Sequence, residues 1–203
     1  AGFAGLAQFN YTAQDAAGLE CEAEVTVRVF GETNLNWPPQ TAVLDDPAGD
    51  STVRVNTPFG VTDIRVPEMA ISHPDPDVTY RIVYAEFRMP VSPVPSSLFT
   101  YAGRAFALFL FGDSQELDGF VFDRPLEVTI EYEPMLVPDP GDLRLYSYKP
   151  VIGLWTNAGL SVMGVDEGRH TFTVSVPHLT EFAVGLPPHG DEEPVVSPHL
   201  FLP

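Results

Sequence analysis

Cysteine is almost absent from this sequence, since Cys21 is the only one among 203 residues. A single cysteine excludes any disulfide within the chain. Cys21 belongs to the same alternating apolar set as Val25 and Val27. We therefore expect it to be a small buried hydrophobic side chain, and the two alternatives are an intersubunit disulfide and a reactive thiol.

Basic residues are also scarce. The chain has ten of them against 28 acidic residues, which gives a net charge of −18, and Lys149 is the only lysine. A protein that binds nucleic acid needs a basic face, so nucleic acid is excluded as a partner. An acidic surface keeps the protein soluble and disfavours anionic membranes.

Long hydrophobic runs and helical periodicity are missing as well. No run of eighteen apolar residues occurs, so membrane insertion is not expected. No stretch repeats its apolar residues with a period of 3.6, and 21 prolines spread along the chain argue against long helices. The pattern that is present is the period-two alternation of β-strands.

The first thirty residues predict a β-hairpin. Two alternating segments flank the turn residues 15–18, which include Asp15 and Gly18. The apolar positions are Ala7, Phe9, Tyr11 and Ala13 in the first segment and Cys21, Ala23, Val25, Val27 and Val29 in the second. An isolated two-stranded hairpin is marginally stable in water, so its apolar face has to be covered.

Short strands with turn signals between them continue along the rest of the chain. The predicted strands are 52–56, 61–66, 78–88, 99–111, 126–132, 143–148, 170–176 and 179–184. The continuous apolar run Ala105–Phe111 predicts a strand buried on both faces or one at an intersubunit contact. This pattern indicates an all-β protein, an antiparallel β-sandwich of immunoglobulin-like or jelly-roll-like type with an N-terminal strand or hairpin extension.

Four segments follow from these patterns. We assign residues 1–34 to the hairpin extension, 35–40 to a linker containing Trp37-Pro38-Pro39, 41–187 to the sandwich and 188–203 to a tail that is acidic and then apolar.

The hairpin resembles the last two strands of immunoglobulin- or cadherin-like repeats in bacterial surface proteins. Those repeats end in a similar F-x-Y-x-A-x-D-x-x-G run followed by V-T-V-x-V, matched here by residues 9–18 and 25–29. The resemblance covers about thirty residues. It implies an extracellular, cell-surface location.

Residues 50–186 resemble the β-sandwich domain of netrin receptors and ankyrins, which bacterial surface proteins also carry. The resemblance rests on residues 61–71, residues 120–130, Trp155 and the closing segment 178–184, and it departs from the family at Glu68-Met69, where a glycine is usual. It implies an interaction or architectural domain without catalysis.

Catalytic and metal-binding motifs are missing from the sequence. There is no G-x-S-x-G, H-E-x-x-H or paired cysteine motif, and the five histidines do not fall at metal-ligand spacings. We therefore predict that the protein is not an enzyme and has no cofactor. By resemblance His178 is structural, and we expect it to hydrogen-bond to the backbone.

Two binding functions remain as alternatives. Aspartates in Pro/Gly loops, at positions 45, 46, 50, 75, 77, 139 and 142, offer oxygen ligands for calcium. None matches the EF-hand pattern, so we interpret them as turn formers. Trp37 and Trp155 offer a stacking platform for sugars, although aromatic residues of sandwiches usually lie in the core. Asn10-Tyr11-Thr12 is a glycosylation sequon.

The leading hypothesis is a structural subunit of an extracellular filament or surface assembly. In it, the N-terminal hairpin of one copy is donated to the sandwich of the next, which makes a head-to-tail contact that does not close. The predicted subunit-binding residues are Phe9, Tyr11, Val25, Val27 and Val29. The alternative hypothesis is an adhesion or carbohydrate-binding module released from a larger surface protein, with glycans or other surface proteins as partners. In either case, packing of the hairpin on its own sandwich is the competing arrangement.

Overall fold

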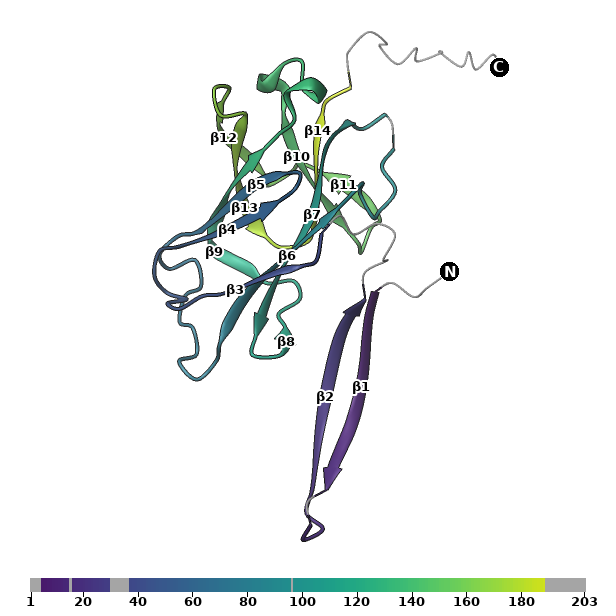
Figure 1. Cartoon of the computed structure of the whole chain (residues 1–203), viewed down its shortest axis with the longest axis vertical. Helices are drawn as coiled ribbons and strands as arrows, with labels where there is room; N and C mark the ends of the chain where they lie inside the picture. The colour runs from purple at the N-terminus through teal and green to yellow at the C-terminus, as the bar shows by residue number, and fades with distance from the viewer. Residues whose placement is uncertain (1–4, 15, 30–36, 96, 189–203) are drawn as a thin grey trace, which may run out of the picture.

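The computed structural model describes residues 5–14, 16–29, 37–95 and 97–188, with backbone only for residues 5–9, 11 and 23–29. The chain is an antiparallel β-sandwich preceded by a separate hairpin (Figure 1). The predicted all-β fold class, with its N-terminal extension, is therefore confirmed.

Two sheets form the sandwich. The seven-stranded sheet has the order β11-β10-β14-β7-β6-β3, with β8 paired to β7, and the five-stranded sheet has the order β12-β13-β9-β5-β4. The strands of the first are β3 (Gln40–Val43), β6 (Tyr80–Phe87), β7 (Thr100–Gly112), β8 (Gln115–Glu116), β10 (Arg144–Lys149), β11 (Leu154–Thr156) and β14 (Glu181–Leu186). The strands of the second are β4 (Ser51–Thr57), β5 (Gly60–Val66), β9 (Val121–Glu131), β12 (Ser161–Asp166) and β13 (Thr171–His178). Two 3-10 turns, η1 (Pro134–Leu136) and η2 (Pro140–Asp142), connect β9 to β10.

The sequence predicted eight of these strands and missed four. The missed strands β3, β8, β11 and β12 are two to six residues long and carry little alternation. Strand β9 starts five residues earlier than expected and contains Pro125. The proline is tolerated because β9 pairs irregularly with β13 there, between Val176 and His178, where a missing N–H costs little.

The main core lies between the two sheets. Ile64, Val128 and Phe172 from the five-stranded sheet are fully buried with Phe106 and Phe182 from the other. The Phe106 ring stacks on Tyr84 at 5.3 Å and on Phe182 at 5.4 Å between ring centroids. Inward residues therefore come from alternate positions of each strand, as the pleat requires.

The outer faces of the two sheets differ in polarity. On the five-stranded sheet, Arg65 binds Asp50 and Glu127, and Thr129 hydrogen-bonds to Thr173 at 2.8 Å. The outer face of the seven-stranded sheet carries two apolar clusters instead. One is Ala85, Phe87, Ala105, Ala107 and Phe109, and the other is Phe99, Tyr146, Trp155 and Ala183.

Strand β7 accounts for the long apolar run. Phe106, Leu108 and Leu110 face the main core, whereas Ala105, Ala107 and Phe109 belong to the outer cluster. Of the two interpretations of this run, the structure shows a strand that is buried on both faces.

A buried ion pair ties the sheets together at one end of the core. Glu86 on β6 is 2% exposed and Arg104 on β7 is 3% exposed, and their charged atoms lie 2.7 Å apart. Arg104 also donates hydrogen bonds to the carbonyls of Phe59 and Glu131 and to the hydroxyls of Thr62 and Tyr84. Thus one guanidinium joins both sheets and the β4–β5 turn.

Burial and close neighbours shift the pKa values of Tyr84 and Arg104 in this network. Burial raises the pKa of the Tyr84 hydroxyl, which therefore stays protonated. Burial opposes the charged form of Arg104, but the contacts with Tyr84 and Glu86 outweigh it and raise the pKa of the guanidinium. Gly60 leaves room for this group: its φ is +130°, and a Cβ there would lie 2.6 Å from Nη1 of Arg104.

We expect Arg104→Met to lower the free energy of unfolding by about 3–5 kcal/mol, because it leaves the Glu86 carboxylate buried without its cation. Urea denaturation followed by fluorescence measures the change. The double variant Glu86→Leu/Arg104→Met should recover part of the loss, since no charge is then buried. A single variant that costs less than about 1 kcal/mol would contradict a stabilising role for the pair.

Candidate functional site

The N-terminal hairpin forms a sheet of its own. Strands β1 (Gly5–Gln14) and β2 (Glu20–Val29) pair antiparallel over ten residue pairs, from Gly5 opposite Val29 to Gln14 opposite Glu20. Gly18 takes a φ of +82° in the turn, a conformation that glycine adopts without strain. Among the described strands, none of the sandwich pairs with β1 or β2, and Figure 1 shows the hairpin projecting from the sandwich.

The register brings the predicted subunit-binding positions together. Phe9 lies opposite Val25, Tyr11 opposite Ala23, and Val29 opposite Gly5, while Val27 lies opposite Ala7. Residues directly opposite in an antiparallel pair share a face. The two alternating sets predicted from the sequence therefore coincide on one side of the hairpin, although the side chains of these five residues lie outside the described part.

The turn end of the hairpin is open to solvent on both faces. Thr12 and Gln14 are exposed on the polar side, and Ala13 and Cys21 are exposed on the apolar side. The expectation that Cys21 is buried is therefore wrong. The thiol is exposed because no sandwich strand in the described part pairs with this hairpin, and it contacts the carbonyl of Glu22 at 3.8 Å.

Apart from the two-residue strand β8, the sandwich has four strands at sheet edges, and they differ in length and burial. Strand β3 has four residues and β11 has three, and the prolines Pro38 and Pro39 stop β3 because they cannot donate to a ladder. Strand β4 has seven residues, with Val55 buried and Val53 packed against the core. In contrast, all six residues of β12 are exposed.

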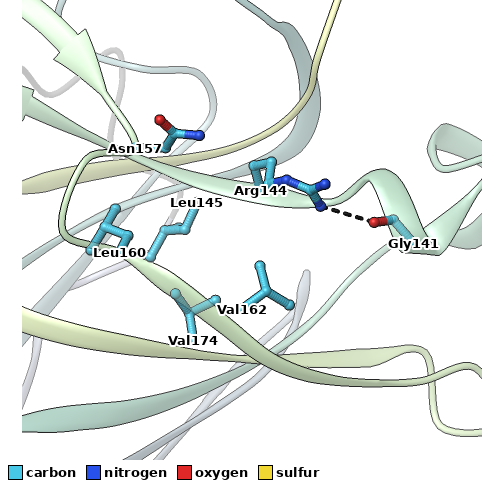
Figure 2. A pocket seen from close by; sticks show the side chains of 7 residues that line it. All are labelled: Gly141, Arg144, Leu145, Asn157, Leu160, Val162 and Val174. Atoms are coloured by element: carbon cyan, nitrogen blue, oxygen red, sulfur yellow. Dashed lines mark hydrogen bonds between the residues drawn. The ribbon is translucent and has the colours of Figure 1, made fainter.

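A cleft of about 360 Å³ opens between the sheets beside β12. Figure 2 shows its lining: Leu145 and Arg144 from β10, Val162 from β12, Val174 from β13, and Gly141, Asn157 and Leu160 from the adjoining loops. The Arg144 guanidinium donates to the carbonyls of Gly141 and Leu143 at 2.9 and 2.7 Å. Leu145 and Val174 join the cleft to the main core, whereas Gly141, Arg144 and Asn157 add polar groups to its lining.

Three of the seven loop aspartates act as turn formers, whereas Asp50 binds Arg65. Asp46 accepts from the backbone N–H of Ala48 and Gly49, Asp75 from that of Asp77, and Asp139 from that of Gly141. Asp45, Asp46 and Asp75 do border one open cleft of about 470 Å³. Within the described ranges, however, no three acidic, histidine or cysteine side chains are grouped closely enough to hold a metal ion.

Trp155 is a core residue and not a surface platform. It is 4% exposed, lies edge-on to Phe99 at 5.9 Å between ring centroids, and donates its indole N–H to the carbonyl of Pro93 at 3.1 Å. Trp155 is therefore not available as a sugar platform, and the interpretation that aromatic residues of the sandwich lie in the core is confirmed for it. Trp37, the other candidate, is 41% exposed.

The segment between β6 and β7 holds Trp155 in place. Glu181 on β14 accepts hydrogen bonds from the backbone of Val91 and from both the backbone and hydroxyl of Ser92. These contacts hold the loop over the aromatic cluster. The sequence showed no sign of this arrangement, since Glu181 and Ser92 are 89 positions apart.

His178 lacks the hydrogen bond expected for it. Its Nδ1 atom is buried and has no partner in the part of the chain that the structure describes. The imidazole sits at the end of β13, opposite Val121, where pairing with β9 is irregular.

Comparisons with known proteins give no family for this chain. A scan against protein-family models finds no match, and a search of curated proteins finds no significant match. No helix in the described ranges is long and apolar enough to cross a membrane.

We expect Trp155→Ala to act on stability alone. Removal of a buried tryptophan should lower the free energy of unfolding by about 3–5 kcal/mol. Urea titration measures this loss, and Trp37→Ala is the matched control because an exposed residue should change stability by less than about 0.5 kcal/mol. Equal, small effects of the two substitutions would contradict a core role for Trp155.

Proposed function

We propose that this chain is a non-catalytic structural subunit of an extracellular filament or surface assembly, in which the N-terminal hairpin of one copy adds to a β-sheet of the next. The observation that carries the proposal is the ten-pair hairpin, which forms a separate sheet with both faces of its turn end exposed.

Burial of the apolar side of the hairpin is the driving force in this proposal. A two-stranded sheet cannot bury its own apolar face, and each fully buried valine or phenylalanine contributes about 1.5–3 kcal/mol. Main-chain hydrogen bonds to an acceptor strand add strength without sequence specificity. The alternating side chains then fix the register, because a one-residue slip would turn them to the wrong face.

Independence of the sandwich from the hairpin also supports the proposal. Its two sheets enclose a continuous core formed by residues from β4 to β14. A domain that has its own core does not need the hairpin to fold, so the hairpin is available to a partner. Each copy then offers one donor and one acceptor, and a contact of this head-to-tail kind builds an open chain of subunits.

No contact in the described part favours the alternative of a carbohydrate-binding module. Trp155 belongs to the core, which leaves Trp37 alone as a partly exposed indole. A sugar platform normally needs an exposed aromatic face with polar groups converging beside it.

Substitutions in the hairpin test the proposal directly. We expect Val25→Glu to raise the concentration needed for assembly about tenfold or more, since a buried valine contributes at least about 1.4 kcal/mol and an ionised side chain adds a cost. Thr26→Glu is the matched control, because Thr26 is the next residue and occupies the other face. Electron microscopy and sedimentation velocity of the purified protein give the readout.

Deletion of residues 1–34 provides the second variant. It should leave a folded monomer, checked by circular dichroism. Wild-type protein that remains monomeric at high concentration would overturn the proposal, as would equal assembly of all four proteins.

Assembly should also respond to salt in a predictable direction. Copies that each carry a net charge of −18 repel one another, and the screening length falls from about 10 Å at 0.1 M salt to about 3 Å at 1 M. We therefore expect assembly at lower protein concentration as sodium chloride rises, measured by light scattering. Calcium chloride at equal ionic strength is the control: a larger effect of calcium would indicate specific binding, and weaker assembly in high salt would contradict burial of an apolar face.

A further inference from the structure

Strand β12 lies at the edge of the five-stranded sheet, and its apolar side chains are only partly buried. Among the described strands it pairs with β13 alone. Val162 lies opposite Val174 and Val165 opposite Phe172, and both partners are fully buried in the core. The two β12 valines therefore face inward, yet each is 37% exposed.

The seven-stranded sheet does not fully cover β12 from the opposite side of the sandwich. Strand β11 pairs only with residues 147–149 of β10, so residues 144–146 of β10 lack a strand partner on that side. The cleft of about 360 Å³ lies at this place, between β10 and β12, and Leu160 and Val162 contribute apolar side chains to its lining (Figure 2). Apolar side chains entering the cleft would complete the core at its open end.

The polarity of the hairpin matches the five-stranded sheet and not the other. One side of the hairpin is apolar, and the other carries residues such as Thr12, Glu20 and Glu22. The five-stranded sheet is likewise apolar inside and polar outside, where Thr129 and Thr173 pair. The seven-stranded sheet is apolar on both faces, so extension of that sheet would place glutamates beside an apolar cluster.

The other edges are less suitable acceptors. Strand β4 already has its inward valines packed against the core, and β3 and β11 are four and three residues long. Strand β12 also lacks the lysine, arginine or proline that commonly protect an edge; its protection is limited to the bulge between Val162 and Gly164 and the charge of Asp166 at its end.

Donor and acceptor lie toward opposite sides of the sandwich. The hairpin is joined through β3, at one end of the seven-stranded sheet, whereas the cleft borders β10, four strands away in the order β10-β14-β7-β6-β3. Four strand spacings amount to about 19 Å. Placement of the two sites on opposite sides suits a contact between successive copies.

We propose that β12 and the adjoining cleft are the acceptor site for the hairpin of a second copy of this chain. The hairpin extends the five-stranded sheet beyond β12, with its apolar positions turned toward the cleft and its glutamates toward solvent. This inference rests on the proposed function and names the surface that the proposed function requires.

Cysteine cross-linking tests the acceptor site. Cys21 is the only cysteine, so wild-type protein can form disulfide-linked dimers at most. A second cysteine in β12, Val162→Cys or Val165→Cys, should give ladders of trimers and longer species on non-reducing gels after mild oxidation. Ala13→Cys in a Cys21→Ser background repeats the test from β1, since Ala13 lies opposite Cys21.

Thr52→Cys on β4 is the matched control, because this position is exposed, and it should give no ladder. A ladder from Thr52→Cys, or a disulfide closed within one chain, would overturn the assignment to β12 of a neighbouring copy. Assembly that persists without any β12 ladder would overturn the acceptor site but leave the proposed function standing. Wild-type protein that does not assemble at all would remove the proposed function itself.

A charged residue at the acceptor gives an independent measurement. Val165→Lys should raise the concentration for assembly at least tenfold with little change in melting temperature, because Val165 is partly exposed and a lysine there can reach solvent. Thr52→Lys, at an exposed position of β4, should leave assembly unchanged. Equal assembly of both variants would count against the β12 site.

Discussion

Each strand of this protein has two faces, and every apolar face has to be covered. The rule is simple because side chains alternate along a strand with a period of two. The five-stranded sheet satisfies it with one apolar face against the core and one polar face in solvent. The seven-stranded sheet is apolar on both faces, so it needs a second cover, which the loop between β6 and β7 supplies over Trp155. The hairpin has one apolar side and no covering strand from the sandwich.

Alternation also explains how much of the fold could be read from the sequence. Strands such as β9 and β13 show it over six or more residues, and both were predicted. Strand β12 was missed because Ser161–Asp166 carries a glycine and a bulge, which break the period. The hairpin and its face were predicted from residues close together in the chain. The cleft proposed as the acceptor surface could not be predicted, since Leu145, Val162 and Val174 meet only through the packing of two sheets.

Polar residues were harder to place than apolar ones. Arg104 and Glu86 look like surface residues within alternating strands, but both lie in the core, where each needs the other. The chemistry of Trp155 left a sugar platform open as an alternative, but its indole is buried and donates its N–H to the carbonyl of Pro93. Cys21 was expected in the interior and lies at the exposed turn end of the hairpin. In each case a contact distant in sequence, or the lack of one, decided the outcome.

The two prolines before β3 affect how far the hairpin can lie from the sandwich. Because neither Pro38 nor Pro39 can donate a backbone hydrogen bond, the ladder between β3 and β6 cannot grow backward past Gln40. Strand β3 therefore cannot lengthen toward the hairpin along this ladder. Eight residues, from 30 to 37, can span at most about 29 Å when fully extended. In the proposed assembly, this length limits how far from β3 the donated hairpin can begin.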